Sequence, residues 1–335
     1  MVIEPDLLSD IICRMNPPVS VLIPVYNGAR YLPATLDSIL SQTYPPSEVV
    51  VLDNGSTDNT REVVTRLGDR VRYHYMENSG VCRARNKAAS FATSQYLAFC
   101  DHDDLWRSDK LAQQMELHRK NPDLHYSFTN FSIVVDDIWS EKTKFEDVRG
   151  EFLLPAVPAG SEPFELDRSI YEELLEFQPI WPSTVVISRE IFDKLGGFRE
   201  EFDKNPSEDF EFSLRCVMNP PIGVVREPVV GVRKHESNFS RDNYKNTRGQ
   251  LEILRFALKN HPISDGTRSL IKRQIEARSV EAAYAAFRRY EFSEVVSLTR
   301  EVDPSLLDSR MRLKVWISKM PPPAADLLVK ILTKN

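Results

Sequence analysis

The chain has 335 residues, of which 41% are hydrophobic, enough to bury the core of one large domain or of a domain with a smaller appendage. Its net charge of −6 argues against a nucleic-acid-binding protein that relies on a broad basic surface. We expect a reduced, cytoplasmic protein, because the four cysteines are scattered, the N-terminus lacks a secretory signal and no apolar run approaches roughly 18 residues.

Strands and helices alternate in the first part of the chain. Four short apolar runs, rich in β-branched and aromatic residues, are predicted strands: 19–26, 48–53, 71–76 and 95–100. Three segments between them space their apolar residues at helical intervals: 31–44, 59–69 and 82–93. This alternation predicts an α/β fold with a mostly parallel sheet covered by helices on both faces.

The later segments differ in character. A helix is predicted at 110–122, a strand at 183–190 and helices at 190–197 and 207–218. Residues from about 136 to 180 lack clear periodicity and are predicted to form a loop-rich insertion. After about residue 244 the patterns are helical only, at 247–260, 268–290, 292–302 and 324–335. We therefore predict an N-terminal extension (1–18), a main domain (19–243) and a C-terminal helical region (244–335).

One apolar strand runs directly into a cluster of acids. In YLAFCDHDDLW, at 96–106, the strand is followed by Asp101, Asp103 and Asp104. Carboxylates so close together repel one another, so the cluster calls for a cation or for water. Asp101 and Asp103 are two positions apart and can face one cation, for which carboxylate oxygens suit Mg²⁺ or Mn²⁺. The alternative is that Asp104 or Ser108 caps the following helix.

Polar residues also follow the other predicted strands, at the sheet edge where open α/β folds bind ligands. Asp53 ends the second strand, where a carboxylate can accept hydrogen bonds from a base or a sugar. Arg83 and Arg85 open a predicted helix, where cations oppose the helix dipole. Either an anionic ligand lies beside these two side chains or both are solvated.

Four segments in order carry a family resemblance: VSVLIPVYNGARYLPATLDSILSQTY, EVVVLDNGSTDNT, NSGVCRARNKA and LAFCDHDDLW. They resemble the successive motifs of family 2 glycosyltransferases, which are inverting enzymes with the GT-A fold that use nucleotide-diphosphate sugars. The resemblance is dense over about 19–120 and continues to about 240. It implies a GT-A catalytic domain at 19–243, with a nucleotide-sugar half at 19–120 and an acceptor half at 121–243.

The resemblance also implies roles for single residues. Three residues after the first strand would border the nucleotide: Pro24, Tyr26 and Asn27. Asp53 would meet the base, and Arg85 would face the base or the diphosphate. Asp101 would lie near the ribose, and Asp103 would bind the divalent metal, in the manner of a DXD motif.

Two further candidates lie in the acceptor half. The family carries an acidic pair after Gly-Gly-Phe, and LGGFREEFDKNPSEDFEFSLR at 195–215 makes Asp209 the general base with Glu208 beside it. From the residues alone, two acids in the first turn of a helix are equally expected. In the predicted loop 232–242, His235 would complete the metal shell or contact phosphate, unless it is a packed or surface residue. Trp181 fills the core or stacks on an acceptor sugar.

These observations predict a metal-dependent hexosyltransferase that moves one sugar from a nucleotide-diphosphate sugar, with UDP the expected nucleotide, to a hydroxyl of a glycan or lipid-linked oligosaccharide. We expect a role in bacterial surface polysaccharide biosynthesis, Mn²⁺ or Mg²⁺ as cofactor and no nucleic-acid partner. A Q-x-x-R-W motif is missing after His235, which favours single addition over polymerisation. The alternatives are a nucleotidyltransferase on a similar sheet and a catalytically silent scaffold that uses the helical tail.

The helices after 244 do not resemble a catalytic element. Packing against the catalytic domain or self-association into a homo-oligomer accounts for their amphipathic patterns. The segment 324–335 could instead lie on a membrane surface at the inner face of the cell membrane, which would suit a lipid-linked acceptor.

Overall fold

A computed structural model of the chain describes residues 16–147, 162–236, 242–321, 323–326 and 328. They divide into two compact units. The first contains the described residues up to Lys204 and Glu208–Glu236, and the second contains Asn205–Ser207 and the described residues after 236. Most of the predicted N-terminal extension lies outside the described residues.

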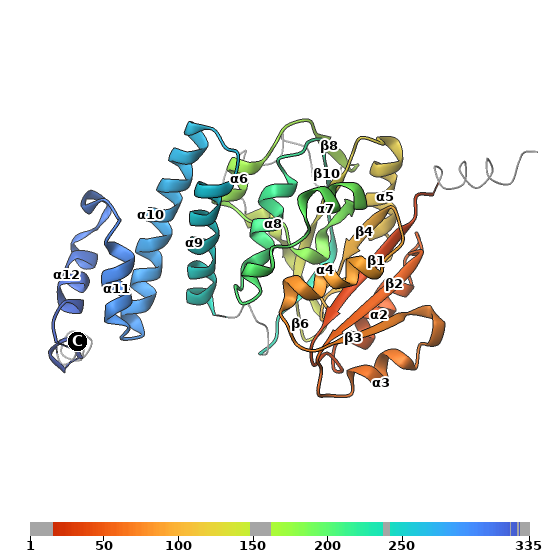
Figure 1. Cartoon of the computed structure of the whole chain (residues 1–335), viewed down its shortest axis with the longest axis horizontal. Coiled ribbons are helices and arrows are strands. Elements are labelled where there is room, and N and C mark those ends of the chain that lie inside the picture. Colours follow the sequence, from red (N-terminus) through yellow and green to blue (C-terminus); the bar gives the residue numbers. More distant parts are fainter. Residues whose placement is uncertain (1–15, 148–161, 237–241, 322, 327, 329–335) are drawn as a thin grey trace, which may run out of the picture. The chain divides into compact units, whose positions relative to one another are not determined.

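The first unit is built on a ten-stranded sheet, ordered β3-β2-β1-β4-β9-β6-β10-β5, with β7 and β8 paired beside that path. Its first four strands are parallel (Figure 1): β1 (Val19–Val25), β2 (Glu48–Asn54), β3 (Arg72–Met76) and β4 (Tyr96–Phe99). Three helices lie between them in the chain, as predicted: α2 (Leu32–Leu40), α3 (Thr60–Thr65) and α4 (Val81–Phe91). Parallel strands align their carboxyl ends, so the polar strand ends meet at one edge.

Burial explains why this half of the sheet could be predicted. Every residue of β1 is buried, as expected for a central strand that is covered on both faces. Helix α2 buries Leu32, Thr35, Leu36 and Ile39, whose spacing puts them on one face. Leu32, Leu36 and Ile39 join β1 in a common hydrophobic core.

The second half of the sheet contains both parallel and antiparallel strand pairs. Strand β9 (Val186–Ser188) runs antiparallel to both β4 and β6 (Tyr126–Val135). Strand β10 (Ile222–Arg233) runs parallel to β6 and antiparallel to β5 (Leu105–Trp106). The sequence patterns identify neither β6 nor β10, because buried Ser, Thr and Asn side chains interrupt the apolar pattern of β6, and Gly and Pro interrupt that of β10.

The segment predicted to be loop-rich is partly regular. Strand β7 (Ile138–Thr143) forms a hairpin with β6, and β8 (Phe164–Leu166) pairs with β10. Helix α6 (Tyr171–Glu176) follows, while residues 148–161 lie outside the described residues. The expectation of a loop throughout 136–180 was therefore wrong for these elements, whose short length left little periodicity to detect.

Three helices complete the first unit: α5 (Lys110–Lys120), α7 (Arg189–Leu195) and α8 (Glu208–Cys216). Helix α7 ends at Gly196 in the left-handed conformation, and its N-cap Ser188 accepts a hydrogen bond from the backbone of Ile191. Helix α8 starts at Glu208, so both acids of the predicted pair lie in its first turn.

The second unit is helical, with α9 (Asn243–Asn260), α10 (Asp265–Arg288), α11 (Phe292–Thr299) and α12 (Ser309–Ser318). Its core joins residues of α10 (Ala282, Ala283, Ala286 and Phe287) to large side chains of the neighbouring helices (Leu251, Val295 and Met311). Helix α12 was not among the helices predicted from the sequence. Most of the predicted helix at 324–335 lies outside the described residues. Among the described helices, none has an apolar stretch long enough to cross a bilayer.

Candidate functional site

The ends of β1 and β2 bring four of the predicted nucleotide-contacting residues together. Strand pairing places Pro24 beside Leu52 and Val25 beside Asp53, so the loop that starts at Tyr26 and Asn27 lies next to the Asp53 loop. Asn27 has a positive φ of 52°, and its side-chain oxygen accepts a hydrogen bond from the backbone of Thr57 at 2.8 Å. Tyr26 is exposed, whereas Pro24 and Asp53 are buried.

Asp53 is held in place by two donors. Its Oδ1 accepts the backbone N–H of Ser56 at 2.8 Å, and its Oδ2 accepts the hydroxyl of Tyr73 at 2.7 Å. Burial and the hydrogen bond to Asp53 raise the pKa of Tyr73, so this phenol stays protonated and donates. Each carboxylate oxygen keeps a second lone pair with which it can accept a further N–H donor.

Arg85 lies between two carboxylates in the interior. Its Nη1 donates to Oε1 of Glu208 at 2.6 Å, and its Nη2 donates to Oδ1 of Asp101 at 2.9 Å. Arg85 is on α4 and Glu208 opens α8, so the ion pairs join two helices to the end of β4. Burial raises the pKa of Glu208, and the positive charge of Arg85 opposes that shift.

The two arginines of α4 therefore have protein carboxylates as partners, and neither is simply solvated. Arg83 Nε lies 3.0 Å from Glu200 Oε2 and 3.3 Å from Asp203 Oδ2. These anions oppose the unfavourable placement of cations at the start of a helix. The predicted contact of Arg85 with a base or diphosphate stays a prediction.

Asp103, the second acid of the cluster, contacts His235 and not Arg85. His235 Nε2 and Asp103 Oδ2 are 2.8 Å apart, and Nε of Arg233 donates to the backbone oxygen of Asp103 at 2.9 Å. Burial raises the pKa of Asp103, but the hydrogen bond with His235 and the imidazole charges outweigh it and leave that pKa below its usual value. Of the predicted loop at 232–242, Val232 and Arg233 are instead the last two residues of β10, whereas His235 follows the strand and belongs to no helix or strand.

An aromatic ring fixes the imidazole. The rings of Tyr31 and His235 are stacked, with centroids 4.4 Å apart and an interplanar angle of 17°. The guanidinium carbon of Arg233 lies 5.1 Å from the centroid of Tyr31. Tyr31 precedes α2, so a residue more than 200 positions away in the chain orients His235.

The third acid of the cluster has a structural role. Asp104 is buried, its Oδ1 accepts the backbone N–H of Arg233 at 3.0 Å, and its Oδ2 accepts the hydroxyl of Ser183. Burial and the charges of Asp103 and Asp101 raise its pKa well above the usual value. The prediction that Asp104 or Ser108 caps the next helix was wrong, because Asp109 occupies the N-cap position of α5 without a side-chain cap.

The three predicted metal ligands are not assembled as one set. Asp101 is paired with Arg85, whereas Asp103 and His235 contact each other. In the described part of the chain, no group of three or more His, Cys, Asp and Glu side chains is arranged to hold a metal ion. Asp103 and His235 still offer one oxygen and one nitrogen ligand, a combination that suits Mn²⁺.

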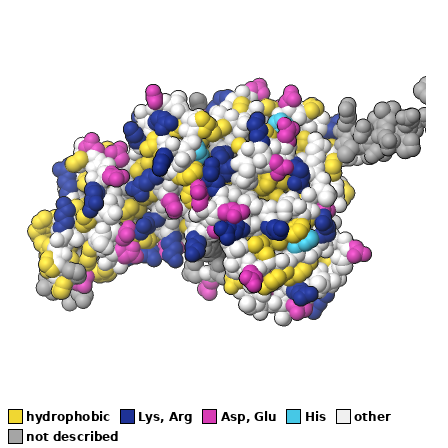
Figure 2. Space-filling model, in the orientation of Figure 1, with side chains coloured by type: hydrophobic (Ala, Val, Ile, Leu, Met, Phe, Trp, Pro, Cys, Tyr) yellow, Lys and Arg dark blue, Asp and Glu magenta, His cyan; other side chains and the backbone are white. Residues whose placement is uncertain are grey.

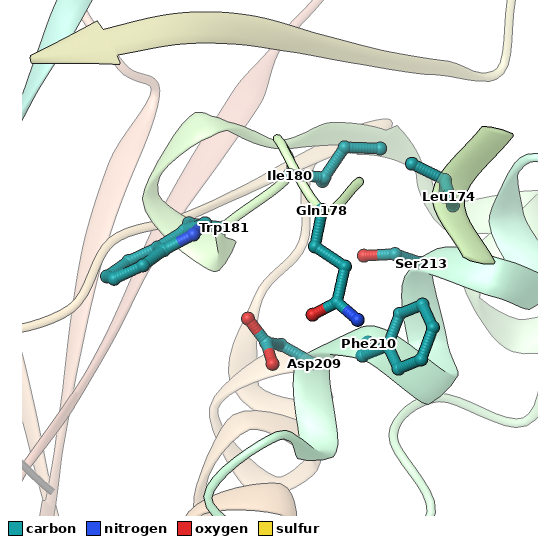
Figure 3. A pocket seen from close by; sticks show the side chains of 7 residues that line it. All are labelled: Leu174, Gln178, Ile180, Trp181, Asp209, Phe210 and Ser213. Carbon is teal, nitrogen blue, oxygen red and sulfur yellow. The ribbon is translucent and has the colours of Figure 1, made fainter. Parts of the chain in front are cut away.

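Asp209 lies in a pocket at the start of α8 (Figure 3). The pocket has a volume of about 260 Å³ including its open mouth, and its lining comes from α6, α8 and the segment between α6 and β9: Leu174, Gln178, Ile180, Trp181, Asp209, Phe210 and Ser213. Figure 3 shows the carboxylate of Asp209 next to the amide of Gln178. Burial and the neighbouring charge of Glu208 raise the pKa of Asp209 to about 8.

Trp181 packs against the core, one of its two predicted roles, whereas stacking on an acceptor sugar stays a prediction. One part of its ring packs on Phe131, with centroids 5.2 Å apart at 49°, and joins the core. The half-buried side chain also lines the Asp209 pocket. Nζ of Lys234 lies 4.2 Å from the Trp181 ring centroid, so a cation covers this aromatic surface.

Several site residues could not be recognised in the sequence. Gln178 and Ser213 line the pocket, but nothing in their local patterns distinguishes them from other polar residues. Tyr31 lies in the first of the four segments that resemble the family motifs, but only the fold shows that it contacts His235. Ser183 donates to Asp104 and accepts the backbone N–H of Asp101 at 2.9 Å, but it was assigned only to a strand.

The raised pKa of Asp209 predicts a pH-dependent cost to stability. An aspartate in an unfolded chain ionises near pKa 3.8, whereas folded Asp209 holds its proton up to about 8. Stability should therefore fall as pH rises through this window, because the unfolded chain releases the proton first. We expect Asp209→Asn to have a higher Tm than the parent at pH 8 and a similar Tm near pH 4, as measured by differential scanning fluorimetry.

Asp193→Asn is the matched control, because it makes the same chemical change at an exposed position of α7. Its Tm should follow that of the parent at both pH values. A gain for Asp209→Asn that is equal at both pH values would contradict the buried-acid explanation.

Comparisons with known proteins identify the family and the fold of the chain. Residues 20–196, more than half of the 335-residue chain, match the model of a family described as glycosyl transferase family 2. TuaG from Bacillus subtilis (strain 168), named for teichuronic acid biosynthesis, is 39% identical over 126 residues, which are 36% of this chain and 50% of TuaG. The match thus spans only half the length of that relative.

A second relative matches over a longer range. WfgD from Escherichia coli, named as a β-1,3-glucosyltransferase that uses UDP-Glc and α-D-GlcNAc-diphosphoundecaprenol, is 27% identical over 240 residues, or 70% of this chain and 85% of WfgD. The structure of S. aureus TarS 1-349 with UDP-GlcNAc has a TM-score of 0.62 at 17% identity, covering 93% of this chain and 92% of that one. This likeness confirms the predicted GT-A fold.

Proposed function

Because the chain belongs to glycosyltransferase family 2, we propose that it transfers one sugar from a nucleotide-diphosphate sugar to an acceptor hydroxyl, with inversion at the anomeric carbon. The observation that carries the proposal is the ion-paired link Glu208–Arg85–Asp101. It connects the helix that bears Asp209 to the strand end that bears Asp103. A proton acceptor and a cation-binding carboxylate are thereby held on one framework, as displacement of a diphosphate requires.

The donor half is residues 19–120, and UDP is the proposed nucleotide. Asp53 accepts an N–H of the base with its remaining lone pairs, while Pro24, Tyr26 and Asn27 border the base and ribose. Asp101 contacts the ribose with the oxygen that does not face Arg85. The names of WfgD, which includes UDP-Glc, and of the TarS complex with UDP-GlcNAc are consistent with this choice.

Asp103 and His235 are the proposed ligands of Mn²⁺ or Mg²⁺. The residues present fit such an ion, because their adjacent oxygen and nitrogen atoms leave further coordination positions to phosphate oxygens and water. When bound, the cation supplies charge stabilisation to the departing diphosphate. Arg233 donates a hydrogen bond to the backbone oxygen of Asp103, and Tyr31 stacks on His235, so each ligand is held in place by a neighbour.

Asp209 is the proposed general base. Its ionised carboxylate accepts the proton of the acceptor hydroxyl as that oxygen forms a bond to the anomeric carbon. The bond from the anomeric carbon to the diphosphate breaks on the opposite face, so the configuration inverts. A pKa of about 8 keeps the carboxylate basic enough to accept this proton near neutral pH.

The pocket around Asp209 is the proposed acceptor subsite, within the acceptor half 121–243. Trp181 offers a ring face beside the base, and the side chains of Gln178 and Ser213 offer hydrogen bonds to sugar hydroxyls. Bacterial surface polysaccharide biosynthesis is the proposed setting, with a glycan or lipid-linked oligosaccharide as acceptor, in line with the names of TuaG and WfgD.

Tyr31 should tune the metal site without binding the metal. Tyr31→Leu removes the ring that stacks on His235, and we expect about a tenfold weaker affinity for Mn²⁺, as is typical when an outer-shell partner is lost. Isothermal titration of the protein with Mn²⁺ in the presence of UDP measures this. Tyr31→Phe keeps the ring and is expected to retain the parental affinity, so equal weakening by both variants would contradict the stacking role.

The function is tested by incubating the full chain with Mn²⁺ and a panel of UDP-, GDP- and dTDP-sugars, with acceptor glycosides added or left out. Release of the nucleoside diphosphate from a UDP-sugar, abolished by EDTA, is the expected result. A nucleotidyltransferase would instead consume a nucleoside triphosphate with a sugar phosphate and release inorganic diphosphate. A scaffold would do neither, and either result would overturn the proposal.

A further inference from the structure

Helix α12 exposes an ordered stripe of side chains. It buries Met311, Ile317 and Ser318 against the second unit, while Leu313 and Trp316 are 46% and 55% exposed. Leu306, in the turn before the helix, is 54% exposed. These are three of the eight large hydrophobic side chains that the described residues expose, and all three fall within eleven positions.

Cations flank the two apolar residues on the helix. Arg310, Leu313, Trp316 and Lys319 are all exposed and follow one another at intervals of three. At 3.6 residues per turn this row winds around the helix, so Leu313 and Trp316 lie at its centre and the two cations point to opposite flanks of that apolar pair. The residues from 309 to 320 include four basic side chains and no acid, although the whole chain carries a net charge of −6. We call Arg310, Leu313, Trp316 and Lys319 the α12 stripe.

The two remaining basic residues of the helix have partners in the second unit. Arg312 donates to the backbone oxygens of Leu307 at 2.8 Å and Pro304 at 2.9 Å. Nζ of Lys314 lies 4.0 Å from the ring centroid of Phe287. These contacts hold the helix on its own unit, and the residues of the α12 stripe stay exposed to solvent. Figure 2 has the same orientation as Figure 1, and in the region where Figure 1 labels α12 it shows hydrophobic side chains at the surface.

We propose that the α12 stripe docks the protein on an anionic lipid bilayer. Leucine and tryptophan insert into the headgroup region, and lysine and arginine at both ends contact anionic headgroups, a combination typical of helices that lie in the membrane interface. The stripe belongs to the second unit, whereas the proposed base Asp209 and the proposed metal ligands Asp103 and His235 belong to the first, so the docking role is separate from the proposed transfer chemistry.

Charge favours lipid over a second copy of the chain. A symmetric contact would bring together two α12 helices that each carry four basic residues and no acid between 309 and 320, so the like charges would repel. An anionic surface instead neutralises both ends at once. The apolar centre of only two large side chains is also small for a stable dimer but sufficient to add to electrostatic attraction at a membrane.

The test is sedimentation of the full chain with vesicles of phosphatidylcholine alone or mixed with phosphatidylglycerol. The parent should bind only the mixed vesicles. Arg310→Gln/Lys319→Gln should lower the partition coefficient by about thirtyfold, since each of the two basic residues contributes about 1 kcal/mol near an anionic surface. Leu313→Ser/Trp316→Ser should lower it by about tenfold or more, because the inserted apolar area is lost.

Two controls match these variants. Lys272→Gln/Arg273→Gln changes the net charge equally at exposed positions of α10 in the same unit, and Ile138→Ser removes an exposed apolar side chain on β7. Both should bind like the parent. The proposal is overturned if the parent does not bind mixed vesicles, if the controls lose as much binding as the stripe variants, or if light scattering shows that the stripe variants only dissolve an oligomer.

Release of nucleoside diphosphate in vesicle-free buffer is measured on the same proteins, and it should be equal in all of them. A failure of the docking proposal therefore leaves the proposed transfer reaction standing, and a failure of the reaction leaves the vesicle result interpretable. Because every substituted side chain is exposed, the variants should also keep the parental Tm.

Discussion

Asp209→Asn is expected to lower kcat for sugar transfer by about a hundred- to ten-thousand-fold, the usual contribution of a positioned general base. Asparagine keeps the shape of the side chain in the pocket with Gln178 and Ser213 but cannot accept the hydroxyl proton. Binding of UDP should be unchanged, because the proposed donor contacts lie on other elements. Steady-state transfer assays and titration calorimetry with UDP measure the two quantities separately.

Asp193→Asn again serves as the control, since it makes the same chemical change on the surface of α7. The parent should also show a rise of kcat/KM with pH as Asp209 ionises, because the pKa of its carboxyl is raised to about 8. Transfer by Asp209→Asn at the parental rate would exclude Asp209 as the base.

Arg85→Met is expected to destabilise the protein by about 3–5 kcal/mol, because it leaves Glu208 buried without its cation. Only 4% of the Arg85 side chain and 8% of the Glu208 side chain are exposed, so water cannot replace the lost partner. Urea unfolding, followed by circular dichroism, measures the change in the free energy of unfolding. Adding Glu208→Gln to Arg85→Met should restore most of the loss, since the unpaired charge is removed.

Arg83→Met is the matched control on the same helix. The Arg83 side chain is 52% exposed, and exposed ion pairs contribute only about 0–1 kcal/mol. A loss for Arg83→Met as large as that for Arg85→Met would show that burial of the Asp101–Arg85–Glu208 link does not determine its energetic weight.

The parallel half of the sheet could be predicted because its signals are local. The apolar runs of β1 to β4 and the helical spacing of Leu32, Leu36 and Ile39 reflect burial that each segment needs by itself. The position of Asp53, Asp101 and Asp103 at one edge of the sheet then follows from the alignment of parallel strand ends. These elements carry the resemblance that the family match confirms.

The rest depends on contacts between distant parts of the chain. The hydrogen bond between Arg85 and Glu208 joins residues 123 positions apart, and that between Asp103 and His235 joins residues 132 positions apart. No local pattern reports which arginine will meet which carboxylate. Strand β6 was missed for a related reason, because Ser127 and Asn130 are polar residues whose burial depends on partners in other elements, Gln114 and Arg226.

The central claim is that Asp103 and His235 hold a divalent cation together with the donor's diphosphate. Calorimetric titration of UDP into the full chain, with Mn²⁺ or with EDTA, tests it most directly. The prediction is binding that requires Mn²⁺ in the parent and in Asp209→Asn and that is lost in Asp103→Asn. Equal UDP affinity with Mn²⁺ and with EDTA, or unchanged Mn²⁺-dependent binding in Asp103→Asn, would contradict the claim.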